Sequence, residues 1–340
     1  MPFGKCKESF FADVTIFAKT FVKKTCKRKR PDLFFVILRK YRTFAANIIV
    51  TRMKKLLFLV AVTLCFCTCK DEKLAVAGSG WNDIAIISKK TGTIEWKHSL
   101  EQGTECNDIE ITPDGHVLFA YSKGAKLINR NHETIWDYQA KDKEEIHTAT
   151  RLKEGGYMIA ICSDPARIVE LDPTGKQTKE ITFRTLIFDN HNQFRQVAKT
   201  DDGIYLVPLI EKRKVLQISP EGRNVGAAFV GYDLFSVKPL KNKNILVSCG
   251  RDGQFIELNP ATPHRDSMFI TSEIQGGILR YVAEIHLYKN GNKLIANSNM
   301  YSDDNAQPLL IEIDKENEVV WSLPYNKEIK NITAVYSFFE

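Results

Sequence analysis

The sequence predicts an all-β fold, a six-bladed β-propeller with four-stranded blades, and three observations indicate it. After Lys73, short β-type runs alternate with turns, and no long helical periodicity appears. A turn that carries Asp or Asn with Gly recurs at intervals of 41 to 48 residues, which is the size of a four-stranded blade. A spare β-type run, 332–339, follows the last repeat.

Two kinds of turn recur together with the short strands. The first comes before an apolar run, as Asp114-Gly115 does before 116–120, and its other copies stand at 155–156, 202–203, 242–244 and 290–292. The second lies inside each unit, as 172–175 does before 176–181. Gly and Asn supply the positive φ that hairpin turns require, and Pro fixes φ just before them. This turn chemistry predicts a succession of β-hairpins.

Six segments carry the pattern, and each is one predicted blade: 74–100, 104–138, 145–183, 190–230, 233–270 and 279–323. The first segment lacks the innermost strand that comes before the Asp-Gly turn elsewhere. The spare run 332–339 would supply that strand and close the ring, which removes two open sheet edges. Six blades are therefore favoured over five or seven. Seven blades remain an alternative if 259–290 contains a degenerate blade.

The stretch 53–69 has the anatomy of a secretory signal. Two lysines come before an uncharged apolar run that is too short to favour a spanning helix, and charged residues follow Cys69. The stretch resembles a bacterial lipoprotein signal, in which the cysteine after the cleavage site receives the lipid. The resemblance implies lipidation at Cys69, with Cys67 as the second candidate and Thr68 and Phe66 as departures from the pattern. We therefore expect an exported protein, lipid-anchored to the bacterial cell envelope at the outer membrane or periplasmic face; plain secretion and an uncleaved anchor stay open.

Charge is divided unevenly along the chain. Residues 1–55 hold 15 Lys/Arg and 3 Asp/Glu, whereas the other 285 residues hold 33 Lys/Arg and 38 Asp/Glu. The mildly acidic body argues against a nucleic-acid partner. A signal must lie at the N-terminus to be read, so we interpret the basic leader 1–52 as an over-extended start before Met53. The alternative is a basic cytoplasmic tail before an anchor. The propeller domain is then 70–340.

Only three cysteines, Cys106, Cys162 and Cys249, lie in the body, far apart in the sequence. None forms a Cys-x-x-Cys spacing, so we expect buried free thiols rather than a metal or redox motif. A single disulfide stays open.

A segment made of a polar turn, a β-branched pair and Trp recurs. It ends at Trp96, Trp136 and Trp321, and we expect each indole to dock one blade on the next. This signature resembles the blades of propellers related to quinoprotein dehydrogenases and bacterial arylsulfotransferases, over about 265 residues. The chain is too short for the eight blades usual in that class of quinoproteins. It is more similar to lipid-anchored six-bladed propellers of Gram-negative bacteria.

A propeller places its binding site at one mouth of the central channel, where inner strands begin. The polar residues expected there are Asn107, His147, His191, Arg195, Asp233, Arg280 and Glu284. We predict that they bind a ligand, namely a glycan, a peptide or a protein partner, and that the propeller is a monomer with no cofactor and no proven catalysis.

Two enzymatic readings stay open. The arylsulfotransferase-like reading implies His147 as nucleophile, with Arg195 or Arg280 stabilising the departing oxyanion. The resemblance to six-bladed lactonase-type propellers implies a calcium-dependent hydrolase. Its Ca²⁺ ligands would be Asn107, Asn190, Asp233 and Glu284.

Overall fold

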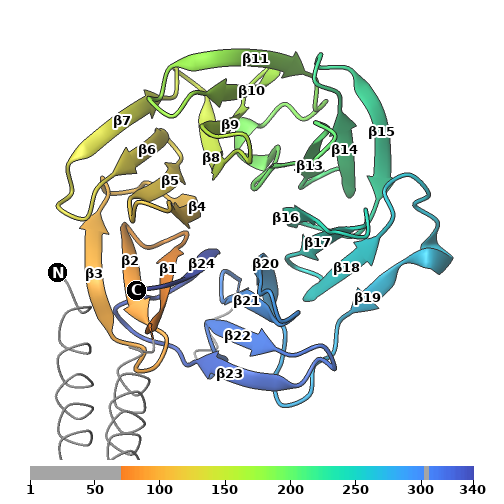
Figure 1. Ribbon diagram of the computed structural model, residues 1–340. Helices are drawn as coiled ribbons and strands as arrows, with labels where there is room; N and C mark the ends of the chain where they lie inside the picture. The colour runs from red at the N-terminus through yellow and green to blue at the C-terminus, as the bar shows by residue number, and fades with distance from the viewer. Residues whose placement is uncertain (1–69, 302–305) are drawn as a thin grey trace, which may run out of the picture. The chain divides into compact units, whose positions relative to one another are not determined.

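The computed structural model describes residues 70–301 and 306–340. They form six four-stranded antiparallel sheets arranged as blades around a central channel (Figure 1). Within the first three sheets, hydrogen bonding connects the strands in the orders β24 (Ala334–Phe339), β1 (Glu72–Ala77), β2 (Asp83–Ser88), β3 (Ile94–Ser99); β4 (Cys106–Ile111), β5 (Val117–Tyr121), β6 (Gly124–Ile128), β7 (Thr134–Gln139); and β8 (Glu145–Arg151), β9 (Tyr157–Cys162), β10 (Ala166–Leu171), β11 (Gln177–Phe183).

The last three sheets follow the same plan. Their strands are β12 (Ala198–Lys199), β13 (Tyr205–Leu209), β14 (Lys214–Ile218), β15 (Asn224–Phe229); β16 (Leu234–Pro239), β17 (Ile245–Cys249), β18 (Gln254–Leu258), β19 (Phe269–Thr271); and β20 (Tyr281–Leu287), β21 (Lys293–Ser298), β22 (Leu310–Ile313), β23 (Val319–Leu323). Two 3-10 helices, η1 (Asn190–Asn192) and η2 (Arg265–Ser267), lie in connections.

The predicted ring closure is confirmed. Strand β24 pairs antiparallel with β1, with Val335 opposite Val76 and Ala334 opposite Ala77. The last strand of the chain is therefore the innermost strand of the first blade. The segment 259–290 contains η2, β19 and all of β20, so it completes the fifth blade and begins the sixth. The described residues contain six blades, and the seven-bladed alternative is wrong.

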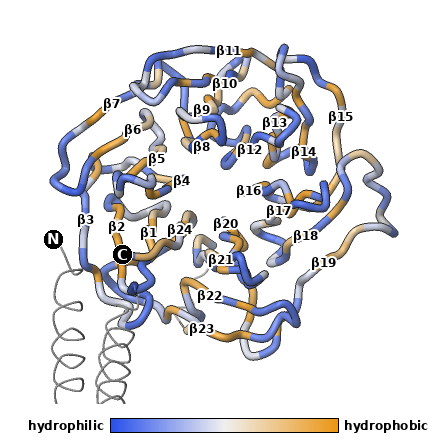
Figure 2. The backbone as a smooth tube through the Cα atoms, in the orientation of Figure 1, coloured by the Kyte–Doolittle hydropathy of each residue, from blue (hydrophilic) through white to orange (hydrophobic). Residues whose placement is uncertain are grey.

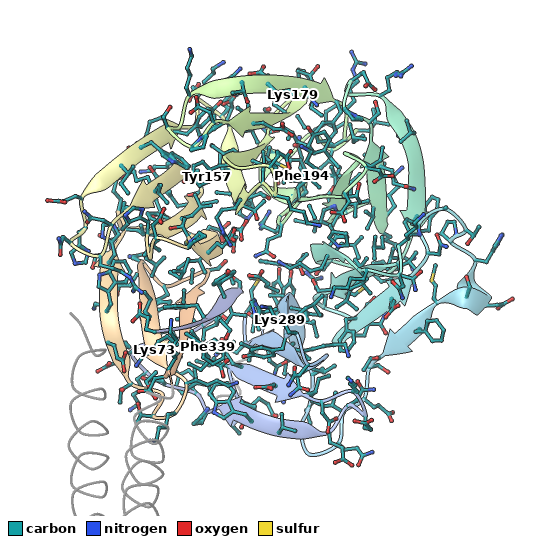
Figure 3. The ribbon with its side chains drawn as sticks, in the orientation of Figure 1. Lys73, Tyr157, Lys179, Phe194, Lys289 and Phe339 are labelled. Atoms are coloured by element: carbon teal, nitrogen blue, oxygen red, sulfur yellow. The ribbon has the colours of Figure 1, made fainter. Side chains whose placement is uncertain are left out.

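Burial follows the position of each strand within its blade. The second strands β5, β9, β13 and β17 are buried at every residue, because each sheet lies between two neighbouring sheets. The outer strand β3 alternates between partly buried and exposed residues, as one solvated face requires. Figure 2 shows the hydropathy along these strands, and Figure 3 shows side chains filling the spaces between blades.

The three tryptophans of the repeat contact the following blade, as expected from the sequence. Trp96 Nε1 donates to the carbonyl of Arg130 at 2.9 Å. The ring of Trp136 lies 5.0 Å from that of Tyr157. The ring of Trp321 lies 5.5 Å from Lys89 Nζ, across the junction between the last blade and the first.

Cys106, Cys162 and Cys249 are free and buried, which confirms the prediction. Burial raises the pKa of Cys162 to about 12. Across the described residues, no helix combines the length and hydrophobicity needed to cross a bilayer. The predicted leader, signal and lipidation site at Cys69 lie outside the described residues.

Candidate functional site at the channel mouth

Four of the predicted site residues meet where β4 and β8 begin. Asn107 lies on β4 and His147 on β8, while His191 and Arg195 lie in the connection between β11 and β12. The hydrogen-bond registers of β4 and β8 both shift at these positions, so Asn107 and His147 each occupy a β-bulge. A bulge turns a side chain away from the regular alternation of a strand, and here both side chains meet each other.

One carboxylate oxygen connects the two histidines. Glu145 Oε2 lies 2.9 Å from His147 Nε2 and 2.9 Å from His191 Nδ1. The orientation of His191 comes from the short helix η1, because the Asp189 carboxylate caps that helix by accepting from the backbone N–H of His191 at 3.1 Å.

The other ring nitrogen of His147 faces Asn107. Nδ1 lies 3.1 Å from the Asn107 side-chain nitrogen. The Asn107 side-chain oxygen accepts in turn from Thr333 at 3.0 Å and lies 3.3 Å from the Ser79 hydroxyl oxygen. The first blade and the closing segment of the ring therefore help to position His147, which is fully buried.

Glu105, directly before β4, completes the group. Its Oε2 accepts from the Ser79 hydroxyl at 2.7 Å. Its Oε1 lies 3.7 Å from His191 Nδ1, 3.9 Å from His147 Nδ1 and 3.8 Å from Arg195. Among the described residues, no donor comes within hydrogen-bond distance of this buried oxygen. Each residue of the mouth cluster, which we define as Glu105, Glu145, His147 and His191, offers a ligand atom within 4.8 Å of the others.

Arg195 lies behind the mouth cluster with its side chain almost fully buried. One terminal nitrogen is 3.1 Å from His191 Nε2, and the other donates to the His191 carbonyl. The guanidinium therefore supports the imidazole of His191 on the side opposite Glu145.

The charges of the mouth cluster follow from these contacts. Burial raises the pKa of Glu145, but hydrogen bonds from the two histidines outweigh it and hold the pKa below the usual value. Burial opposes ionisation of Glu105 too, yet His147 and Arg195 keep its pKa low. Burial, with Arg195 nearby, lowers the pKa of His147, whereas the hydrogen bond to Glu145 raises that of His191. The mouth therefore presents two ionised carboxylates, one neutral imidazole and one imidazole that readily takes a proton.

A pocket of about 350 Å³ opens beside this cluster. Glu105, Glu145 and His191 line it, together with small or polar residues: Gly80, Asn82, Gly103, Thr104 and Ser122. The small side chains leave part of each of Glu105, Glu145 and His191 accessible from solvent, whereas the oxygen Glu105 Oε1 itself is buried.

The other predicted site residues lie elsewhere. Asp233 comes directly before β16 and pairs with Arg251 at 2.9 Å. Arg280 comes directly before β20, and its backbone N–H donates to Asn297 at 2.7 Å. Both belong to blades on the far side of the channel from β4 and β8 (Figure 1).

Glu284 is the fourth residue of β20 and lies inside the channel rather than at its mouth. Its Oε1 is 2.5 Å from Lys238 Nζ, and its Oε2 accepts from Gln196 at 2.8 Å. Asn190 donates to the carbonyl of Lys143. The four side chains suggested for Ca²⁺, which include Asn107 and Asp233, are therefore not brought together as one set of ligands.

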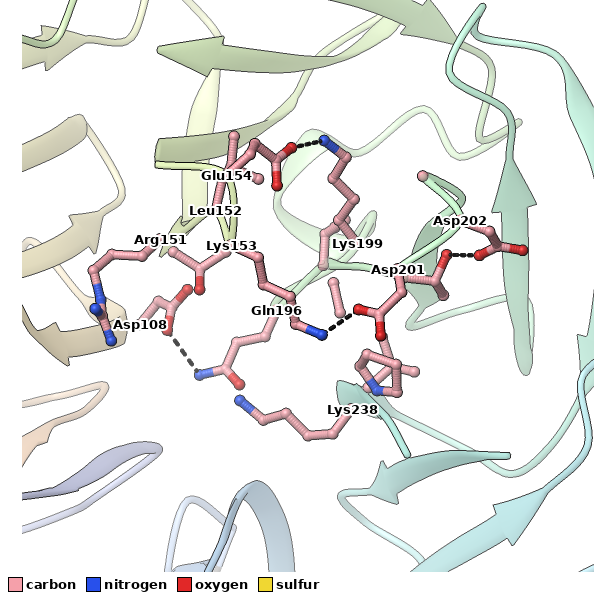
Figure 4. A pocket seen from close by; sticks show the side chains of 17 residues that line it. Asp108, Arg151, Leu152, Lys153, Glu154, Gln196, Lys199, Asp201, Asp202 and Lys238 are labelled. Carbon is pink, nitrogen blue, oxygen red and sulfur yellow. Dashed lines mark hydrogen bonds and ion pairs between the residues drawn. The ribbon is translucent and has the colours of Figure 1, made fainter. Parts of the chain in front are cut away.

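A larger pocket of about 680 Å³ opens along the other ends of the inner strands and includes Asp108, Gln196, Lys199 and Lys238 (Figure 4). Its charged side chains neutralise each other. Lys199 pairs with Glu154 at 2.5 Å, and Lys153 pairs with Asp201. Among the described residues that line this pocket, the buried side-chain atom without a hydrogen-bond partner is the uncharged amide oxygen Gln196 Oε1, whereas at the mouth it is the carboxylate oxygen Glu105 Oε1.

Glu105, Glu145, Ser79 and Thr333 are not among the ligand residues predicted from the sequence, although Glu145 opens the predicted mouth segment that carries His147. A signal for two of them was present, since Glu105 and Glu145 come two residues before Asn107 and His147, and residues two apart share a strand face. Ser79 and Thr333 reach the site only through ring closure, and the sequence around them carries no comparable signal.

Comparisons with known proteins fit this architecture. Residues 80–309 match the family described as Mal s 1 allergenic protein-like. A protein of unknown function from Bacteroides caccae is 36% identical, with 79% of this chain and 100% of that chain covered and a TM-score of 0.76. No curated protein matches the sequence.

More distant solved structures share the fold alone. A catalytically inactive variant of virginiamycin B lyase from Staphylococcus aureus, solved with quinupristin, is 11% identical, with 80% of this chain and 94% of that chain covered and a TM-score of 0.53. A functionally unknown protein from Desulfotomaculum acetoxidans is 12% identical, with 79% and 88% covered and a TM-score of 0.51.

Proposed function

The chain belongs to the Mal s 1 allergenic protein-like family, and we propose that it is an exported, lipid-anchored propeller that binds a carbohydrate in the pocket beside Glu105, Glu145 and His191. The observation that carries the proposal is the buried Glu105 Oε1, which has no hydrogen-bond donor among the described residues. A buried acceptor without a donor is costly, and a ligand hydroxyl that donates to it removes this cost.

The pocket chemistry favours a sugar over an apolar ligand. Carboxylates accept from hydroxyl groups, and the partly exposed side chains of Asn82 and Ser122 in the lining both donate and accept. The volume lies at the lower end of the range for small-molecule sites, about 300–1,000 Å³. A compact, hydroxyl-rich ligand therefore suits the pocket better than a folded protein partner.

Binding is favoured over covalent catalysis because of His147. Its side chain is fully buried, and both ring nitrogens take part in hydrogen bonds to Glu145 and Asn107. A nucleophile needs a free nitrogen that faces the substrate. The exposed imidazole of the pair, His191, has both nitrogens engaged as well, with Glu145 and Arg195.

Isothermal titration calorimetry against a panel of neutral and amino monosaccharides and disaccharides tests carbohydrate binding. We expect at least one sugar to bind the wild-type protein and to raise its melting temperature. Glu105→Gln should weaken that binding, whereas Glu316→Gln, in an exposed turn of the last blade, should leave it unchanged. Binding to none of the sugars, or binding that Glu105→Gln leaves intact, contradicts the proposal; capture of a peptide instead would favour the protein-partner alternative.

The proposed anchor has its own test. In a Gram-negative host, the chain begun at Met53, where the proposed signal stands at the N-terminus, should partition into the detergent phase after Triton X-114 extraction. Cys69→Ala should move it to the aqueous phase, because acyl chains supply the affinity for the bilayer, whereas Cys67→Ala should not. Detergent partition that survives Cys69→Ala contradicts lipidation at that cysteine.

A further inference from the structure

We infer that the mouth cluster of Glu105, Glu145, His147 and His191 binds a divalent transition-metal ion of the Zn²⁺ class. The inference rests on the proposed function in one respect, since the ion would lie at the inner end of the proposed sugar pocket. It extends that proposal by naming a cation as part of the binding surface.

The spacing of the four side chains suits a tetrahedral ion. Zn²⁺ bonds of about 2.0–2.2 Å to nitrogen and oxygen place neighbouring ligand atoms about 3.4 Å apart. Glu145 Oε2 lies 2.9 Å from both His147 Nε2 and His191 Nδ1, and Glu105 Oε1 lies 3.7 Å from His191 Nδ1. These three separations differ from that value by about 0.5 Å or less, and all four ligand atoms lie within 4.8 Å of one another.

The donor set selects the class of metal. Two imidazole nitrogens and two carboxylate oxygens suit Zn²⁺ and its neighbours, whereas Ca²⁺ prefers six to eight oxygen ligands. The two carboxylates, from Glu105 and Glu145, offer negative charge to a cation. Together their two negative charges balance the ion.

The ligands also have supporting partners, as metal ligands usually do. The Ser79 hydroxyl holds Glu105 Oε2, which leaves Oε1 directed at the histidines. Asn107 lies against His147 Nδ1. Its amide can present oxygen to a protonated Nδ1 after a half-turn, because the neighbouring hydroxyls of Ser79 and Thr333 accept as well as donate.

A second pair of histidines provides an internal control. His98 Nδ1 and His132 Nδ1 lie 3.0 Å apart on the surface of the first two blades. Among the described residues, the mouth cluster is the one group of three or more His, Cys, Asp or Glu side chains placed to hold a metal ion. His98 and His132 have no carboxylate that completes such a group with them. This pair is therefore expected to bind Zn²⁺ more weakly than the mouth cluster.

The test is a titration of the full chain, stripped with EDTA and kept free of sugar, with ZnCl₂ and with CoCl₂. We expect saturable binding to the mouth cluster, a rise in melting temperature and visible Co²⁺ absorption without a sulfur-to-cobalt charge-transfer band, which excludes the cysteines as ligands. His191→Ala and Glu145→Gln should lower the affinity by more than the roughly 10- to 100-fold typical of an outer partner. His132→Ala should leave it unchanged. Zn²⁺ affinity that is equal in wild type, His191→Ala and Glu145→Gln overturns the inference.

The Zn²⁺ affinity of an Arg195 variant tests whether His191 binds the ion, because a merely structural role of the cluster would leave that affinity unchanged. Arg195 lies 3.1 Å from His191 Nε2, and ligation through Nδ1 places a proton on that nitrogen, facing the guanidinium. Arg195→Gln replaces the guanidinium with an amide that can accept from Nε2–H, so Zn²⁺ should bind more tightly. Weaker binding by Arg195→Gln contradicts ligation through His191 Nδ1.

The two proposals fail separately. Sugar binding is measured in EDTA, where no metal is available, and Zn²⁺ binding is measured without sugar. Each experiment therefore tests one proposal. Sugar binding in EDTA together with no specific Zn²⁺ binding overturns the metal site alone. Zn²⁺ binding together with no sugar binding, with or without the ion, overturns the carbohydrate proposal alone.

Discussion

Asp108 and Glu284 approach the same side-chain amide inside the channel, although 176 residues separate them in the sequence. Gln196 Nε2 lies 2.8 Å from Glu284 Oε2 and 3.4 Å from Asp108 Oδ1. Glu284 also accepts from Lys238, whereas Asp108 accepts from the backbone N–H of Ala149 at 3.0 Å. The two carboxyl groups therefore share the Gln196 amide but differ in their other partners, a lysine for Glu284 and a backbone N–H for Asp108.

Asp108→Asn should become increasingly more stable than wild type as the pH rises. Burial, and then the charge of Glu284, raise the pKa of Asp108 well above its usual value of 3.8. A folded-state pKa above the unfolded value gives stability that is present below about pH 3.8 and is lost as the pH rises through the folded pKa. Asparagine does not ionise, so its advantage over wild type should grow with pH by up to about 1.4 kcal/mol per unit across that window.

Urea unfolding at several pH values between 4 and 8 measures this difference. The exposed Asp142→Asn serves as the control and should follow the pH dependence of wild type. If Asp108→Asn also follows wild type, Asp108 ionises at its ordinary pKa and the structural argument is wrong.

Ile332→Ala tests the closure of the ring. Ile332 is fully buried in a cluster with residues of the first and last blades, among them Leu74 and Leu310. Removing its side chain should lower the free energy of unfolding by about 2–5 kcal/mol, as large-to-small changes in cores do. Val320→Ala, on the exposed face of an outer strand, should change it by less than about 0.5 kcal/mol. Equal effects in a denaturant titration would contradict a closed ring.

The blade count and the closure could be predicted because both depend on local chemistry. Turn residues such as Asp114-Gly115 mark each hairpin, and the spare run at the C-terminus matches the strand missing from the first repeat. Their spacing is visible without knowledge of any long-range contact. The blade count therefore follows from signals that lie within about 50 residues of each other, whereas the closure follows from a comparison of the first repeat with the C-terminal run.

The site was harder to predict because it depends on β-bulges and on how far along its strand each residue lies. The bulges at Asn107 and His147 turn these side chains together, and nothing in the sequence marks them. Glu284 was expected at the mouth, yet as the fourth residue of β20 it lies roughly 10 Å along the strand, at about 3.3 Å per residue. Its partners Gln196 and Lys238 come from two other blades, a meeting that only the three-dimensional ring specifies.

The three thiols of the propeller should resist alkylation in the native state. Cys106, Cys162 and Cys249 are buried, and burial raises the pKa of each thiol, which suppresses the reactive thiolate. Iodoacetamide at pH 8 followed by peptide mapping should find them unmodified in buffer and fully modified in guanidinium chloride. Rapid native modification of Cys249 would contradict its placement in the interior.

Gly175→Ala and Gly115→Ala separate backbone strain from blade packing. Both glycines have positive φ, +86° and +80°, so each alanine carries a similar strain of about 1–3 kcal/mol. A Cβ at Gly115 would meet nothing within 4 Å, whereas a Cβ at Gly175 would lie 2.7 Å from Trp136 Cβ of the preceding blade. Gly175→Ala should therefore be the more destabilising of the two in thermal unfolding, and Trp136→Gly, which removes both the indole and its Cβ, should remove most of the difference when both glycine substitutions are made in that background. Equal losses at the two glycines would show that Trp136 does not pack tightly against the next blade.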